Sequence, residues 1–509
     1  MSSCSSSGMG DLASCTTGMG FPKSVIQVRL DNHYAARIYT TSSPVSGEVT
    51  IATRRDTPFD SIQILLVGNS KTTVEGVNGC HQVTHTFLKV PMPVPESSYP
   101  DPRVLEAGRI YTVPFHFVIP QYLTMNACNH AVRSDLVRDH HVLLPPSMHE
   151  WERDDLAPRM AQVEYVICAR VFRRAEAEGK NTKLLEATQR IRVLPASAEE
   201  PPVSVTKHDR LYTLSKSKTL RKGLFSGKLG RVTAVGTQPP PVIVHPDGFG
   251  PITATGTTAR VELAFDPAVI DILPPSVSAI SGKIVAHTFY SGGPIANLPN
   301  VGDWSREATI DKRGSYAASV SLPGLSAGKV RWKQQLSAAV RRDSGYSSQS
   351  NEGDETAFSD VESPEERTKQ RRSSHEKTGS KAKHRQRADS GGSPIYHVAT
   401  LDIPIDLPLD KKTFIPTFHS CIASRVYVLQ LALTLGTGSA STTLNLSLPI
   451  QVMVGSADQG LDAELPSFET AVEESEADAH LLPRVIQVPH QEYTLTSSLP
   501  GYGDSAPWR

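Results

Sequence analysis

The sequence predicts an all-β protein built from two sandwich domains. Three observations support this prediction: apolar and polar residues alternate over many short runs, clusters of Pro, Gly, Ser and Asn separate these runs, and long apolar stripes at helical spacing are nearly absent. A period of two belongs to half-buried strands, and many short strands with frequent turns are typical of β-sandwiches. At 509 residues the chain is too long for one hydrophobic core, which favours two domains.

The alternation is clearest in two runs. Their apolar members are Val163, Tyr165, Ile167, Ala169 and Val171 in the first run, and Leu444, Leu446, Leu448, Ile450, Val452 and Val454 in the second. This spacing gives each strand one apolar face that can pack on a core. Pro449 has no N–H for a ladder hydrogen bond, so the second strand is expected to lie at a sheet edge or to break there.

Other short runs extend the pattern along the chain. Residues 49–51 and 61–64 flank a polar loop and are expected to form a pair of neighbouring strands. Further strands are expected at residues 110–119, 188–194, 261–265, 280–290 and 315–322. The Ala-Glu-Glu-Pro-Pro sequence that ends at Pro202 favours extended backbone and a domain boundary. The predicted sandwiches therefore cover residues 21–200 and 201–455.

Three segments are predicted to be disordered. They are the N-terminal residues 1–20, an insert at residues 341–392 within the second sandwich, and the tail at residues 456–509. The insert contains no Leu, Ile, Met, Trp or Cys, so it cannot bury enough apolar surface to offset the entropy of ordering. The tail begins with an acidic stretch that has no Lys or Arg, and it continues as a polar segment.

Composition excludes several classes of protein. The 52 basic and 52 acidic residues balance, which argues against nucleic acid as a partner because such binding needs a sustained positive field. The six cysteines (Cys4, Cys15, Cys80, Cys128, Cys168 and Cys421) show no repeated spacing and are interpreted as free thiols in a reducing compartment. The N-terminus lacks the features of a signal peptide, and no apolar run is long enough to span a bilayer.

The order of several segments resembles an arrestin. The segments are Gly47–Ile51, Ile62–Gly68, Ala107–Pro120, Leu144–Ser147 and Val163–Val171 in the first half, and Phe414–Leu429 and Leu448–Val452 in the second. The resemblance covers roughly Pro22 to Val454 and is closest to fungal α-arrestin-like proteins, the arrestin-related trafficking adaptors. It implies two sandwiches that act as a cargo adaptor. Fungal members typically link membrane transporters to a WW-domain HECT ubiquitin ligase through short Pro-Tyr motifs.

One motif near the end of the chain fits that role. Leu499, Pro500 and Tyr502 form an L-P-x-Y sequence, in which proline presets a polyproline-like backbone and tyrosine fills the adjoining pocket of a WW domain. The alternative is a tail with no docking role. Leu465-Pro-Ser-Phe468 is a weaker copy with Phe in place of Tyr, and Pro394-Ile-Tyr396 is expected to serve structure instead. The full P-P-x-Y motif does not occur.

The insert carries candidate regulatory residues. Ser344, Ser348, Ser373 and Ser374 are candidate phosphorylation sites, because they follow basic residues or lie in a D-S-G-x-x-S sequence. Four lysines of the same segment are candidate ubiquitin acceptors: Lys369, Lys377, Lys381 and Lys383. No lysine follows Lys412, so the tail that holds the L-P-x-Y motif offers no acceptor of its own.

Catalytic and metal-binding patterns were weighed and set aside. His130, His140, His141 and His149 cluster near Cys128, but their spacing matches no regular zinc pattern, so no metal is expected. Residues 324–328 match G-x-S-x-G without an α/β pattern around them, and a turn between strands explains the match better than a nucleophile. The sequence therefore predicts a protein that is not an enzyme and needs no cofactor.

A basic stretch lies near the start of the predicted second sandwich. Residues 207–231 contain eight Lys or Arg with apolar residues between them, which suits contact with anionic lipid, although a solvated first strand of the second sandwich is favoured.

We expect a cytoplasmic adaptor that is recruited to the plasma membrane or endosomes. Its partners would be the cytosolic tails of transporters or receptors and a WW-domain HECT ligase. The alternative is a β-sandwich scaffold for trafficking or signalling complexes that meets no ligase.

Overall fold

The computed structural model confirms the predicted all-β class. It describes residues 24–336 and 395–455, apart from residues 35, 77–78, 150, 175–180, 207–208, 223–226, 247–251, 303, 305–311, 327, 329 and 439. Strands make up most of these residues. The segments that the sequence predicts to be disordered, residues 1–20, 341–392 and 456–509, lie outside the described residues.

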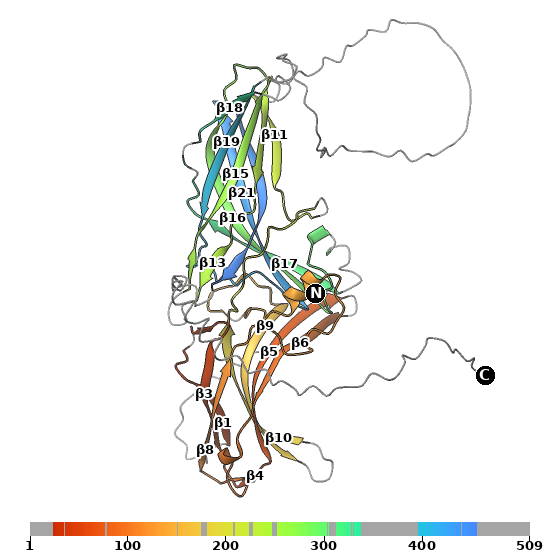
Figure 1. Cartoon of the computed structure of the whole chain (residues 1–509), viewed down its shortest axis with the longest axis vertical. Coiled ribbons are helices and arrows are strands. Elements are labelled where there is room, and N and C mark those ends of the chain that lie inside the picture. The colour runs from red at the N-terminus through yellow and green to blue at the C-terminus, as the bar shows by residue number, and fades with distance from the viewer. Residues whose placement is uncertain are drawn as a thin grey trace, which may run out of the picture. The chain divides into compact units, whose positions relative to one another are not determined.

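The first half of the chain forms one sandwich (Figure 1). One of its sheets has the strand order β1-β3-β8, the other has the order β2-β10-β9-β5-β6, and β4 pairs with β7. The elements are β1 (Val25–Leu30), β2 (Ile38–Tyr39), β3 (Pro44–Ala52), β4 (Thr57–Pro58), β5 (Ser61–Gly76), β6 (Gly79–Met92), the 3-10 helix η1 (Glu96–Ser98), β7 (Val104–Leu105), β8 (Ile110–Val118), α1 (Asp135–His141), β9 (Ala161–Arg174) and β10 (Asn181–Val193).

The second half forms another set of sheets. Their orders are β11-β12-β15-β19-β18, β14-β13-β23 and β17-β16-β21-β20, and β22 also pairs with β21. The strands are β11 (Ser215–Arg221), β12 (Lys228–Gly236), β13 (Val242–His245), β14 (Thr253–Thr255), β15 (Thr257–Pro267), β16 (Ser276–Ser291), β17 (Arg313–Leu322), β18 (Lys333–Leu336), β19 (Ile395–Ile405), β20 (Phe418–His419), β21 (Ala423–Thr437), β22 (Ala440–Ile450) and β23 (Val452–Val454). Figure 1 shows β16 and β21 side by side, as their pairing requires.

The alternating runs become strands with one buried face. The five apolar residues of β9 that the sequence singles out have no exposed surface. Leu444 to Ile450 form β22 with the apolar members buried, and the chain then leaves this sheet, because Val452–Val454 pair with β13. The predicted break near Pro449 is therefore confirmed.

One predicted pairing is wrong. Residues 49–51 and 61–64 were expected to be neighbouring strands, but they belong to β3 and β5, which lie in different sheets. β3 pairs with β1 and β8, and β5 pairs with β6 and β9. The polar loop between them crosses from one sheet of the sandwich to the other, because each sheet takes its partners from more distant parts of the chain.

The connector is the segment that joins the two halves of the chain near Pro201. Hydrogen bonds hold its residues 197–200 against the end of the second half. Ser197 N donates to the Val454 carbonyl, and the Ser197 hydroxyl accepts from Val454 N. Glu200 N donates to the Gln451 side chain, whose amide donates to the Ala198 carbonyl. The segment around the predicted domain boundary therefore lies against the last strands of the chain instead of running as a loose linker.

We predict that the insert is dispensable for folding. Deleting Arg341–Gly392 and joining the ends with a short Gly/Ser bridge should leave the thermal transition of the full chain nearly unchanged. The flanking strands β18 and β19 already pair, with Leu336 opposite Ile395, and the cost of closing a loop depends only weakly on its length. Differential scanning calorimetry of both proteins tests this. An insoluble or unfolded deletion variant would show that the segment packs on the sandwich.

Candidate functional site

The two sandwiches meet through a joint to which both contribute. We define the joint as residues 144–160 of the first sandwich together with residues 409–427 of the second. Ile415, Phe418 and Ala423 of the second sandwich belong to the first hydrophobic core, and Leu156 of the first sandwich belongs to the second core. Each sandwich therefore places apolar side chains in the core of the other, which ties their packing together.

A fully buried arginine lies within this joint. Arg425 on β21 has no exposed surface, and its Nε donates to the hydroxyl of Thr288 on the paired strand β16 at 2.8 Å. Its Nη1 donates across the joint to the Asp155 carbonyl at 2.9 Å, and its Nη2 lies 3.7 Å from the Met148 sulfur. A guanidinium keeps its charge when buried, so these acceptors compensate part of the desolvation cost.

The loop that receives Arg425 is held in a specific shape by a buried carboxylate. The Asp155 side chain accepts from His149 N at 2.6 Å and from Ala157 N at 3.1 Å. His149 and Leu156 have φ values of 83° and 61°, which are costly for residues with a side chain. The carboxylate therefore stabilises a backbone that would otherwise relax, and this backbone presents the Asp155 carbonyl to Arg425.

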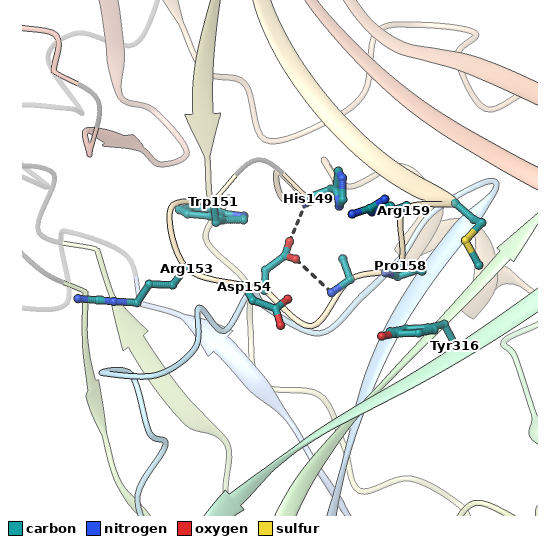
Figure 2. A pocket seen from close by; sticks show the side chains of 10 residues that line it. His149, Trp151, Arg153, Asp154, Pro158, Arg159 and Tyr316 are labelled. Atoms are coloured by element: carbon teal, nitrogen blue, oxygen red, sulfur yellow. Dashed lines mark hydrogen bonds between the residues drawn. The ribbon is translucent and has the colours of Figure 1, made fainter. Parts of the chain in front are cut away.

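A pocket of about 430 Å³ opens over the same loop. Figure 2 shows Trp151, Arg153, Asp154 and Arg159 around it, with Tyr316 entering from β17 of the second sandwich. Trp151 donates from Nε1 to the Ser147 carbonyl, so its ring is fixed. Burial would raise the pKa of the Asp154 carboxyl. The Lys412 ammonium 2.6 Å away and the hydrogen bond from Leu156 N outweigh this effect, so the pKa is lowered. The pocket thus offers an aromatic wall and charges of both signs.

A second pocket, of about 610 Å³, lies along the connector. Its walls come from the proline-rich segments 143–146 and 195–203, and from residues 298–299 and 416–419. The lining is largely apolar, and its polar end holds His140, which lies 3.7 Å from Glu200. Burial raises the pKa of Glu200, and the neighbouring His140 only partly opposes that shift. Such a concave apolar surface suits an apolar or proline-bearing peptide.

The histidine cluster is split by the fold. Cys128, His130 and His141 gather with Cys421 of the second sandwich, and their ligand atoms all lie within 4.8 Å of one another. His140 instead faces His419 and Glu200, and His149 lines the pocket of Figure 2. Burial, together with the neighbouring histidines, lowers the pKa of His141 to about 4 and that of His419 to about 3, so both rings are neutral at physiological pH.

Most residues of the predicted sites lie outside the described part of the chain. This applies to Leu499, Pro500 and Tyr502 of the L-P-x-Y motif and to Leu465–Phe468. It also applies to the candidate phosphorylation sites Ser344, Ser348, Ser373 and Ser374, and to the candidate acceptors Lys369, Lys377, Lys381 and Lys383.

Three other sequence features can be placed. Tyr396 lies in β19 and donates to the Gln335 side chain on β18, so its role is structural, as expected. The G-x-S-x-G match begins in the turn that follows β17, where Gly324 has a φ of 68°. In the basic stretch, Lys216, Lys218 and Arg221 are exposed on β11, a solvated strand at the end of its sheet, which agrees with the favoured interpretation.

Sequence reasoning missed the joint. Arg425 sits in a run of apolar residues that marks a buried strand, and nothing in that run indicates which groups from the first sandwich would bind it. The Asp154-Asp155 pair after an aromatic residue and before Pro158 is the one local signal of a structured loop. Among the described residues, no helix is long and apolar enough to cross a membrane.

We predict that Asp155→Ala destabilises the protein by about 3 kcal/mol, the loss of two hydrogen bonds to a charged acceptor at roughly 1.5 kcal/mol each. Asp402→Ala is the matched control, because Asp402 is exposed on β19 in an ion pair with Arg260. Its removal should cost about 0–1 kcal/mol. Urea unfolding of the full chain measures both. Equal losses for the two variants would contradict the role assigned to Asp155.

Comparison with known proteins agrees with this architecture. Residues 329–454 match the family model described as the Bul1 C terminus, a region that contains β18 to β23 and therefore Cys421 and Arg425. That family has an arrestin-related adaptor role in trafficking and is not a family of enzymes. A search of curated proteins finds no match. The family match and the all-β fold together confirm the resemblance seen in the sequence, which is to arrestin-like proteins of the fungal α-arrestin type.

Proposed function

We propose that this protein links membrane-protein cargo to a WW-domain HECT ubiquitin ligase and so promotes ubiquitination, endocytosis and sorting. The observation that carries the proposal is the match of residues 329–454 to the Bul1 C terminus, an adaptor family. An adaptor of this kind needs one surface for cargo and another for the ligase. The sandwiches and the tail would divide these two tasks.

The joint supplies surfaces that suit cargo. The pocket of Figure 2 combines a fixed Trp151 ring with Arg153, Arg159 and Asp154, a mixture that can bind a polar peptide with both charges. The connector pocket adds a second, largely apolar concave surface. Cytosolic tails of transporters or receptors present such peptides. Aromatic rings that are already immobilised contribute binding at a low entropic cost.

The tail supplies a motif that suits the ligase. Pro500 presets an extended backbone, and Tyr502 would fill the aromatic groove of a WW domain. A single contact of this size gives modest affinity, so binding to one ligase would gain from the second segment at Leu465–Phe468.

The protein would work in the cytoplasm and reach the plasma membrane or endosomes by binding cargo there. Exposed Lys216, Lys218 and Arg221 on β11 could add contact with anionic lipid, at about 1 kcal/mol per charge.

We predict that the tail binds WW domains through the L-P-x-Y motif. A labelled peptide of residues 497–509 should bind a tandem WW protein with a Kd between about 1 and several hundred μM, as expected for a single short motif. Pro500→Ala combined with Tyr502→Ala should weaken binding at least tenfold, because the preset backbone and the anchoring ring are both removed. Fluorescence anisotropy measures these affinities.

The same peptide contains its own control. Pro507→Ala with Trp508→Ala removes another proline and aromatic residue outside the motif, and binding should persist. In cells, affinity capture compares the full chain with a chain that lacks the last twelve residues. The shortened chain should lose the ligase but keep cargo. A wild-type peptide that fails to bind at several hundred μM, roughly the weak end of motif recognition, would favour the scaffold alternative.

We also predict where ubiquitin is attached to the adaptor itself. Because no lysine follows Lys412, a ligase docked on the tail needs an acceptor elsewhere in the chain, and we expect the insert or the first half of the chain to supply it. Lys369, Lys377, Lys381 and Lys383 are the expected acceptors. Mass spectrometry of the modified protein maps the sites, and changing all four to Arg should reduce modification several-fold. Modification confined to lysines in strands of the second sandwich, such as Lys283, would contradict this geometry.

A further inference from the structure

The strongest unassigned feature of the molecule is the group formed by Cys128, His130, His141 and Cys421. All four ligand atoms lie within 4.8 Å of one another. His141 and Cys421 are buried, whereas Cys128 and His130 are half-buried. We propose that these residues bind one Zn²⁺ ion as a closed Cys₂His₂ site that joins the two sandwiches.

The spacing of the group fits tetrahedral zinc. With Zn–S near 2.3 Å and Zn–N near 2.0 Å, neighbouring ligand atoms in a tetrahedral site are about 3.3–3.8 Å apart. Cys128 Sγ and His130 Nε2 are 3.5 Å apart, which already equals such an edge. Since no separation exceeds 4.8 Å, none needs to shorten by more than about 1–1.5 Å, which is within reach of small side-chain rotations. Two thiolates also balance the charge of Zn²⁺, which makes the site neutral.

Both histidines are arranged as zinc ligands require. His130 Nδ1 lies 3.3 Å from the Ala131 carbonyl, so donation to that oxygen leaves the Nε2 lone pair directed at the cysteine sulfur. Ligating histidines almost always use their second nitrogen in this way. His141 is fully buried, and within the described part of the chain neither of its ring nitrogens has a hydrogen-bond partner. A buried polar group without a partner is unfavourable, and a bond to zinc would use one of these lone pairs.

The surrounding backbone holds the ligands in place. His141 lies on the buried face of α1 together with Val137, one turn earlier, and Ser134 caps the start of that helix. His85 of β6 forms a hydrogen bond through Nε2 with the Ala127 carbonyl at 2.8 Å, which ties the segment just before Cys128 to that strand. Ile295 N donates to the Cys421 carbonyl at 2.8 Å. The ligand set is therefore preorganised on three separate segments of the chain.

A disulfide between Cys128 and Cys421 is the competing chemistry. It would use both sulfurs and leave the His130 and His141 rings, whose centroids are 5.3 Å apart, facing a bond that they cannot coordinate. Zinc accounts for all four residues at once. Tetrahedral S₂N₂ coordination favours zinc among the common divalent metals, and four protein ligands leave no open position, which indicates a structural site and not a catalytic one.

The ion would act as a cross-link between the sandwiches. Three ligands come from residues 128–141 of the first sandwich, and the fourth lies in the turn between β20 and β21 of the second. Some 280 residues separate His141 from Cys421. Cys421 is four residues before Arg425, so zinc would fix the turn that leads into the buried arginine.

Metal analysis of the full-length protein, purified without a histidine tag or chelator, tests the proposal. Elemental analysis should find about one zinc per chain, and Co²⁺ exchanged into the site should give the visible d–d bands of tetrahedral S₂N₂ coordination. Cys421→Ser and His141→Asn should each lower zinc retained against a competing chelator at least tenfold. Chelation should also lower the thermal transition of the wild type.

Matched controls keep these outcomes interpretable. Cys168→Ser removes another thiol that is equally buried, and His140→Asn changes the neighbour of His141 outside the group, so both should retain zinc. Should a ligand variant fail to fold, the metal content, cobalt spectrum and chelator response of the wild type still decide the question. Wild-type protein that takes up neither Zn²⁺ nor Co²⁺ stoichiometrically under reducing conditions would overturn the proposal. A Cys128–Cys421 disulfide in protein alkylated at lysis would also overturn it, as would equal zinc in the ligand variants.

Discussion

The burial of Arg425 constrains how the two sandwiches meet. A guanidinium cannot shed its charge, so its burial is tolerated only where acceptors from the protein replace water. One acceptor, the Thr288 hydroxyl, belongs to the same sheet, but the Asp155 carbonyl comes from the other sandwich. Moving the sandwiches apart would remove the Asp155 acceptor from this buried charge, a loss of about 1.5–3 kcal/mol. The arginine therefore selects one relative packing in a way that apolar contacts alone cannot.

The constraint extends from Arg425 to the surfaces that suit cargo. The Asp155 carboxylate shapes the loop that meets the arginine, and the same loop forms the floor of the pocket in Figure 2. His419 lines the connector pocket, and this residue ends β20, directly before the turn that leads into β21. A peptide bound in either pocket would contact elements that hold the joint. If these pockets bind cargo as proposed, cargo binding and inter-sandwich packing would be linked through shared residues, which is the physical requirement for one to influence the other.

Sequence patterns predicted those structural features that depend on residues close together in the chain. The strand from Val163 to Val171 was recognisable because its period of two is local, and the break near Pro449 followed from one missing N–H. The pairing of residues 49–51 with 61–64 failed because sheet partners in a sandwich are set by distant strands. The gathering of Cys128, His130 and His141 with Cys421 could not be predicted for the same reason, because Cys421 arrives from a distant part of the chain. Arg425 carries no local signal, because its partners Thr288 and Asp155 come from distant parts of the chain.

The division of the chain into sandwiches and tail separates two physical demands. Cargo recognition needs preorganised surfaces, and the joint is suited to this proposed task because hydrogen bonds fix Trp151, Asp155 and Arg425. Ligase docking needs only a short accessible motif, for which a proline supplies most of the preorganisation. A weak motif is sufficient when cargo and ligase are already concentrated at one membrane, since effective concentration then replaces intrinsic affinity. In the proposed adaptor, selectivity would therefore reside in the sandwiches, whereas the tail would determine which enzyme is brought to the cargo.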